Sequence, residues 1–130
     1  MDFDVDKTIS YWIESAEYDL GVADALFRVE KYPYALFMRH LALEKLLKAL
    51  VVKNTKSHAP YTHSLPLLAS KLSIELPREI KKKLARFMEF YFEAIYPDEQ
   101  KNFYAKCTKE FTERNLNEIK EVFEWLKKKL

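Results

Sequence analysis

The chain has 130 residues, 48% of them hydrophobic, which is enough for one sizeable core but not for two. It contains one glycine and five prolines, a composition that favours helices because β proteins need more glycine for their turns. The 22 basic and 20 acidic residues give a net charge of +2, which excludes a generally basic nucleic-acid binder but allows a local basic patch. We therefore expect one helical domain over residues 1–130.

The first two helices are predicted from apolar spacing and from their flanking residues. Asp4 or Asp6 could cap the first helix, which ends at the "KYP" stretch of residues 31–33. Gly21 lies in its middle and is expected to allow close approach of another helix. Its apolar residues keep a helical spacing: Ile9, Trp12, Ile13, Ala16, Leu20, Ala23 and Phe27. The second helix is predicted from about residue 33 to 54.

Three further helices follow a loop over "TKSHAPYTHS". A short helix is predicted for residues 65–72, and Pro77 opens a long one. The stretch "YPDEQKNFYAKC" is expected to be a loop or a partly helical link, and Thr108 could cap the last helix. Four long helices and one short one, joined by modest loops, predict an all-α, up-and-down bundle.

The cysteine count and the absence of apolar runs bear on the compartment. The single cysteine, Cys107, cannot form an internal disulfide, which suits a reducing environment. No segment approaches the roughly 18 consecutive apolar residues of a membrane span, and the acidic start "MDFDVDK" does not resemble a signal peptide. We expect a cytoplasmic protein. No phosphate-binding loop, dinucleotide fingerprint, nucleophile elbow or zinc-protease motif appears, so no cofactor is predicted.

The stretch "RHLALEKLLKAL", residues 39–50, carries charges on an otherwise apolar helix. At about 100° per residue, His40, Glu44 and Lys48 fall within roughly 80° of one another, whereas Arg39 and Lys45 point elsewhere. Two interpretations remain open. The stripe is either a solvated edge, with a Glu44–Lys48 pair worth roughly 0.2–0.5 kcal/mol, or a partly buried polar cluster. Asp19 of the first helix could join such a cluster.

Two other groups of residues could serve as sites. Arg78, Lys82 and Arg86 share one helical face, which could meet a phosphate-bearing partner or simply face solvent. His58 and His63 lie in one loop, and Cys107 or Asp98 could in principle complete a metal site with them. We predict no metal there, and we expect His63 to cap or buttress the short helix.

The region from residue 87 to 104 has more aromatic residues than one core needs. A helix cannot bury three consecutive aromatics, here residues 90–92, against a single neighbour. The surplus predicts either a subunit interface or a surface on which a base stacks. We expect a homodimer. The aromatic residues concerned are Phe87, Phe90, Tyr91, Phe92, Tyr96, Phe103 and Tyr104.

Several of these motifs together resemble the HEPN family, the higher eukaryote and prokaryote nucleotide-binding domains. The first helix resembles the family's opening helix in "YWIESAEYDL", and "YPYALF" resembles its tyrosine-rich approach to the second. The family's A-x-E-K-x-x-K-A core is matched by "ALEKLLKA", its H-x-L by His63 and Leu65, and its Y-x₃-R-Y-P-D nearly by "YFEAIYPD". The resemblance spans residues 9–130 and implies a helical bundle that commonly pairs as a dimer.

What the resemblance implies about function depends on two departures from the family pattern. Ile95 replaces the arginine before Y-P-D, and no arginine–histidine pair has the R-x₄₋₆-H spacing of the ribonuclease branch. We therefore expect no metal-independent ribonuclease activity and no catalytic residues. The resemblance implies a nucleotide-binding or interaction module, a partner of a minimal nucleotidyltransferase in a two-component, toxin–antitoxin-like system. The alternatives are a ribonuclease toxin with other catalytic residues and a purely structural dimerisation module.

The same resemblance links the Y-P-D segment to the polar stripe as a nucleotide site. In that site Tyr96 would stack a base and Asp98 would accept hydrogen bonds from ribose or base. Lys48 would face phosphate, and His63 would order the loop from the other side. The loss of the cation at position 95 implies weak phosphate affinity, with a dissociation constant no tighter than roughly micromolar.

Overall fold

The computed structural model describes residues 3–130, apart from the side chains of residues 97–100. All regular structure in this part of the chain is helical, which confirms the predicted all-α bundle. The link after Tyr96 is itself a helix, because Pro97 occupies its first turn, where no backbone N–H is needed. The helices are α1 (Val5–Arg28), α2 (Tyr32–Thr55), α3 (Leu65–Ser70), α4 (Arg78–Ile95), α5 (Pro97–Lys106) and α6 (Lys109–Lys127).

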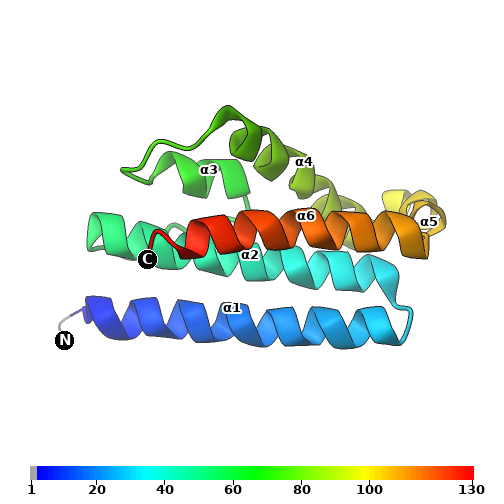
Figure 1. Cartoon of the computed structure of the whole chain (residues 1–130), viewed down its shortest axis with the longest axis horizontal. Coiled ribbons are helices and arrows are strands. Elements are labelled where there is room, and N and C mark those ends of the chain that lie inside the picture. The colour runs from blue at the N-terminus through cyan, green and yellow to red at the C-terminus, as the bar shows by residue number, and fades with distance from the viewer. Residues whose placement is uncertain (1–2) are drawn as a thin grey trace.

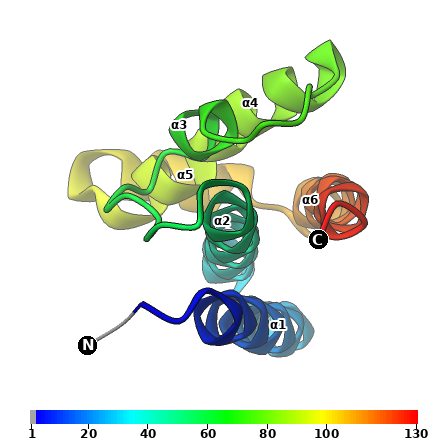
Figure 2. The same cartoon turned by 90° about the vertical axis from the view of Figure 1, so that its left-hand side faces the viewer.

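Helix α2 is the centre of the bundle and contacts each of the other five helices. Figure 1 shows α1 running antiparallel along it, and the end-on view of Figure 2 places α1, α6 and the α3–α4 pair on three different sides of α2. Of its 24 residues, 14 are buried, as expected for a helix that is apolar over most of its circumference. No helix in the described part of the chain is long and apolar enough to cross a membrane.

The core lies between α2 and the helices α3 to α6, and α1 packs on its outer side. Helix α1 meets α2 through the fully buried Ala16 and Ala23, whose small side chains permit a close helix approach. The larger apolar residues of α1 flank this contact and are only partly covered. The largest fully buried side chains include Phe87, Phe90, Phe103, Leu36, Leu43, Leu46, Leu47 and Ile119.

Side-chain caps begin three of the helices. Asp4, Ser64 and Thr108 each accept a hydrogen bond from the backbone N–H three residues later, at 3.0–3.1 Å. Asp4 therefore caps α1, and Thr108 caps α6 as predicted. Of the two roles expected for His63, capping the short helix is wrong, because Ser64 occupies that position; His63 binds Glu44 instead, and a buttressing role stays a prediction.

Gly21 does not allow a close helix approach, and that expectation is also wrong. It is exposed on α1, and a Cβ added there would have no neighbouring atom within 4 Å. Alanine loses less backbone entropy than glycine on entering a helix, so Gly21→Ala is expected to raise the free energy of unfolding by about 0.5–1 kcal/mol.

The measurement is a urea unfolding curve, with the exposed Ala25 of the same helix as the matched position. Ala25→Gly should lower the midpoint by a similar amount. A midpoint that falls in Gly21→Ala would mean that a neighbour occupies the space beside residue 21.

Candidate functional site

Glu44 of α2 is the centre of a buried polar cluster, and only 3% of its surface is exposed. One carboxylate oxygen, Oε1, accepts a hydrogen bond from His63 Nδ1 at 3.1 Å, and Oε2 accepts one from Lys48 Nζ at 3.1 Å. His40 Nε2 lies 3.9 Å from Oε1. We call His40, Glu44, Lys48, His63 and Tyr91 the Glu44 cluster. Its burial supports the second interpretation of the stripe and excludes a solvated edge.

His40 is fully buried between α2 and α4. Its Nδ1 lies 3.3 Å from the carbonyl oxygen of Phe87, and because a carbonyl only accepts, Nδ1 carries the proton. The other ring nitrogen then faces Glu44 without a hydrogen. Burial lowers the pKa of His40 from 6.5 to about 4, outweighing the nearby Glu44 carboxylate, which acts to raise it. His40 is therefore neutral at pH 7.

His63 belongs to the loop between α2 and α3, and Glu44 fixes its orientation. Its side chain is 55% exposed, whereas that of Glu44 is 4% exposed. The imidazole stacks on Tyr91 of α4, with ring centroids 4.6 Å apart. Burial, and next the Glu44 charge, raise the pKa of Tyr91, so its phenol stays protonated. The arrangement presents an imidazole with a fixed Nδ1–H and an aromatic surface beside it.

Lys48 and Asp19 both have partners within the bundle. The Lys48 ammonium pairs with Glu44 and also lies 5.1 Å from the ring centroid of Trp12 on α1, which satisfies it in a largely buried position. Asp19 lies outside the cluster and pairs with Lys45, at 2.8 Å. Lys45 thus pairs with Asp19 and Lys48 with Glu44, and Lys48 is only 8% exposed.

The remaining residues of the expected nucleotide site lie at the end of α4. Tyr96 is 53% exposed and connects to the cluster through Phe92: the rings of Tyr91 and Phe92 are 5.5 Å apart, and those of Phe92 and Tyr96 are 6.1 Å apart. Asp98 lies in the first turn of α5, and its side chain is outside the part of the chain that the structure describes.

The expected phosphate-facing patch is partly occupied by partners. Arg86 donates hydrogen bonds to Asn115 and Glu118 of α6, which ties α4 to α6. Lys82 lines a surface hollow of about 350 Å³ between these two helices, and Arg78 is exposed at the start of α4. Glutamate side chains line the same hollow, so the patch is of mixed charge.

The residues considered as metal ligands, His58, His63 and Cys107, do not lie together in the structure. His58 packs against Phe3, with ring centroids 4.1 Å apart, whereas His63 binds Glu44. Cys107 is buried, and burial raises the pKa of its thiol to about 12, so it is neither ionised nor accessible. Among the described residues, no three histidine, cysteine, aspartate or glutamate side chains are placed to hold a metal ion.

Arg39 is a buried structural residue that the sequence did not single out. Its Nη1 donates to the carbonyl oxygen of Leu116 on α6, and its Nη2 donates to Asp24 of α1, both at 2.7 Å. One guanidinium therefore joins three helices. The helical spacing placed Arg39 away from the polar stripe. The neighbouring sequence did not indicate that its guanidinium would be buried between α1 and α6.

Arg39→Met is expected to lower the free energy of unfolding by about 2 kcal/mol, because the buried carbonyl of Leu116 loses its donor. Arg39→Lys should recover only part of this loss, since one ammonium cannot replace the two-armed guanidinium. The measurement is the urea midpoint. Arg28→Met is the control: Arg28 is exposed beside a surface hollow that Arg39 also lines, and its replacement should change the midpoint little. Equal midpoints for the two methionine variants would contradict the role given to Arg39.

The fold and the cluster define a class: an all-α bundle whose central helix holds a loop histidine through a buried carboxylate. The family model of the HEPN domain matches residues 9–130, so the chain belongs to the HEPN family, as the sequence motifs indicated. No curated protein is significantly similar to it in sequence.

Two solved structures share the fold. The crystal structure of TT1696 from Thermus thermophilus has a TM-score of 0.80 and 21% identity, covering 94% of this chain and 98% of that one. ST0689, described as an archaeal HEPN homologue, has a TM-score of 0.71 and 20% identity, covering 93% and 96%. At these identities the similarities bear on the fold alone.

Proposed function

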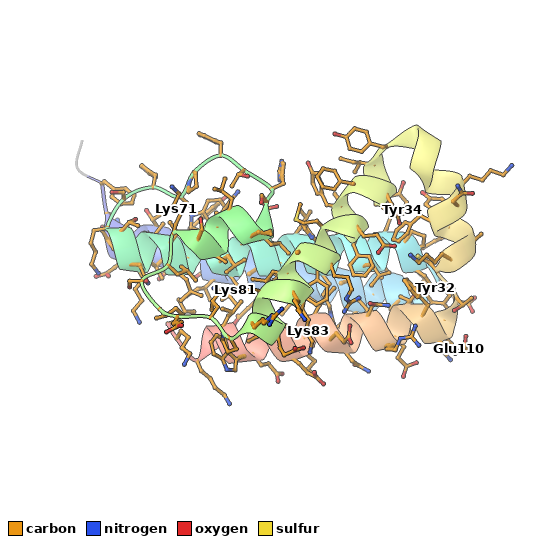
Figure 3. The ribbon with its side chains drawn as sticks, turned by 90° about the horizontal axis from the view of Figure 1, so that it is seen from above. Tyr32, Tyr34, Lys71, Lys81, Lys83 and Glu110 are labelled. Carbon is orange, nitrogen blue, oxygen red and sulfur yellow. The ribbon has the colours of Figure 1, made fainter. Side chains whose placement is uncertain are left out.

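We propose that this HEPN protein is a non-catalytic binding module that works as a homodimer. The observation that carries the proposal is a group of exposed apolar side chains at one end of the bundle. We call Tyr34, Phe92, Ile95, Tyr96 and Tyr104 the aromatic face, and each is 39–53% exposed. They come from α2, α4, α5 and, for Tyr96, the residue between α4 and α5. Figure 3 shows Tyr34 at the end of α2 that lies beside α5.

Ring contacts join four members of the aromatic face into two pairs. Tyr34 meets Tyr104 at 6.2 Å, and Phe92 meets Tyr96 at 6.1 Å. The half-buried Phe37, one turn after Tyr34 on α2, stacks on Tyr91, which in turn meets Phe92. Contact with Tyr34, followed by burial, raises the pKa of Tyr104 to about 12, which keeps that phenol neutral. Other exposed large hydrophobic residues are spread over α1, the loops and α3, and no ring contact joins them to the aromatic face within the described part of the chain: Tyr11, Tyr18, Val29, Tyr61 and Leu67.

Association of two copies would remove this surface from water. Single exposed apolar residues are normal on a protein, but contiguous aromatic groups are typical of interfaces. A second copy is the occupant that we favour, because the same face on both partners is self-complementary in a two-fold dimer.

Light scattering at micromolar concentration tests the dimer. The expected mass is twice the 15.5 kDa of one chain. Phe92→Glu and Tyr96→Glu should give monomers, because each would place a carboxylate in the interface. Leu67→Glu, on α3 and also exposed, is the control and should leave the dimer intact. A wild-type protein of 15.5 kDa would refute the proposal.

Nucleotide binding is a second candidate, favoured by the exposed imidazole of His63 stacked on Tyr91 close to Tyr96. Stacking on such rings contributes about 1–3 kcal/mol per base. The Lys48 ammonium is held by Glu44, and Ile95 supplies no cation, so phosphate would add little. We expect a dissociation constant no tighter than roughly micromolar.

Titration of ATP and GTP, followed by backbone amide shifts, tests this candidate. Shifts near residues 40–48, 63 and 91–98 that disappear in His63→Ala but persist in His58→Ala would support it. Tyr96 belongs to both candidate surfaces, so a base and a second copy would compete for it. The monomeric Phe92→Glu variant should then bind nucleotide at least as well as the wild type.

The narrower roles rest on the family resemblance. Partnership with a minimal nucleotidyltransferase is the role that we favour for the dimer, and co-purification with such an enzyme encoded beside it would support this. The rival ribonuclease role would need a base outside the R-x₄₋₆-H pattern. Cleavage of RNA that is lost in His63→Ala would favour that rival over a binding module.

A further inference from the structure

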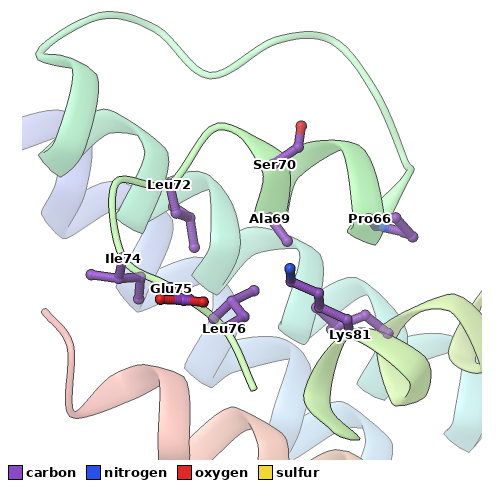
Figure 4. A pocket seen from close by; sticks show the side chains of 9 residues that line it. Pro66, Ala69, Ser70, Leu72, Ile74, Glu75, Leu76 and Lys81 are labelled. Carbon is purple, nitrogen blue, oxygen red and sulfur yellow. The ribbon is translucent and has the colours of Figure 1, made fainter. Parts of the chain in front are cut away.

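A hollow of about 370 Å³ lies between α3 and the first turns of α4, closed on one side by the segment that joins them. Figure 4 shows its lining from close by. Most of the lining is apolar, and none of it belongs to the Glu44 cluster or to the aromatic face. The apolar residues that line the hollow include Ala69, Leu72, Ile74, Leu76 and Leu84, of which Leu76 and Leu84 are buried at its base. Its size is at the lower end of small-molecule sites, which combine an apolar lining with a few polar groups.

Two opposite charges flank this apolar lining. Lys81 extends from α4 toward α3, and Glu75 extends from the joining segment on the other side of Leu76 (Figure 4). Within the described part of the chain, neither side chain forms an ion pair or a side-chain hydrogen bond. The hollow therefore offers one unpaired cation and one unpaired carboxylate beside an apolar surface.

We propose that this hollow binds a free α-amino acid with an aliphatic side chain. The ligand carboxylate would pair with Lys81, its ammonium with Glu75, and its side chain would cover the apolar lining. A monocarboxylate without the amine would pair with Lys81 but would be repelled by Glu75. A simple amine would pair with Glu75 but would be repelled by Lys81. Only a zwitterion satisfies both charges at once. Both charged groups are exposed to solvent, so the affinity is in the millimolar range, roughly 0.1–10 mM.

The test is a titration of the full chain with L-leucine, followed by backbone amide shifts. Shifts are expected at residues 69–76 and 81–84. Two probes of the same shape separate the charges: 4-methylpentanoate lacks the ammonium, and 3-methylbutylamine lacks the carboxylate. Each should bind about tenfold more weakly than L-leucine. No shift with about 10 mM L-leucine, or equal responses to all three probes, would overturn the proposal.

Variants assign the two charges. Lys81→Met and Glu75→Gln should each weaken L-leucine binding about tenfold, and because both positions are exposed, the amide spectrum should otherwise stay that of the folded protein. Lys83→Met is the matched control. Lys83 lies on the same helix as Lys81 (Figure 3) but lines a different hollow. Binding that is unchanged in Lys81→Met, or weakened equally in Lys83→Met, would refute recognition of a zwitterion.

Discussion

Replacing Glu44 by alanine is expected to lower the free energy of unfolding by about 3 kcal/mol, which is typical of breaking a buried ion pair by removing one partner. The substitution leaves the Lys48 ammonium in a position that is only 8% exposed, and it releases His63 from its only hydrogen-bond partner within the cluster. Desolvation of the remaining charge is the main cost, because Lys48 cannot reach water without disturbing its contact with Trp12.

Urea unfolding at pH 7 measures this effect, and an exposed pair on the same protein provides the control. Glu17 pairs with Lys127 at 2.9 Å, with both side chains about half exposed, so Glu17→Ala should cost well under 1 kcal/mol. A double variant, Glu44→Leu with Lys48→Met, should recover most of the loss because neither charge remains buried. If Glu44→Ala and Glu17→Ala had the same urea midpoint, the Glu44 cluster would contribute no more to stability than an exposed ion pair.

The stability of the wild-type protein is expected to fall steeply as the pH drops from 6.5 to 4, with His40 as a principal cause. The pKa of His40 is 6.5 when exposed and about 4 in the buried site, so the unfolded chain binds the proton more readily than the folded one. The contribution of neutral His40 is complete above pH 6.5 and is lost as the pH falls. A tenfold difference in proton affinity corresponds to about 1.4 kcal/mol, and the loss amounts to about 3 kcal/mol by pH 4.

Urea midpoints of wild type and His40→Gln, measured from pH 8 to pH 4, isolate this contribution. Glu44, His63 and Tyr91 face His40 from α2, the loop and α4. Both proteins contain these groups, so the difference between their pH profiles reports His40. The variant should lose less stability than the wild type between pH 6.5 and pH 4. Parallel profiles would show that His40 stays neutral in the unfolded chain or charged in the folded one.

Local signals were sufficient to predict most of the helices. Asp4 and Thr108 cap their helices as the sequence indicated, because a capping side chain bonds to an amide only three residues away. The shared side of His40, Glu44 and Lys48 also followed from helical geometry alone. The prediction for Gly21 failed for the opposite reason. Whether another helix passes beside a residue depends on tertiary packing. A glycine in the sequence does not by itself indicate that a neighbour is present.

The sequence by itself determined every helix except α5, the apolar circumference of α2 and the polar stripe on it, since each follows from spacing along one segment. Only the tertiary structure decided which partner each charge would meet. Glu44 receives a loop histidine 19 residues away, Asp19 pairs with Lys45, and Arg39 reaches a carbonyl 77 residues along the chain. The residues around a charge on a helix do not indicate which distant residue will pair with it. That choice is made when the packed helices bring unlike groups together and exclude the water that would otherwise screen them.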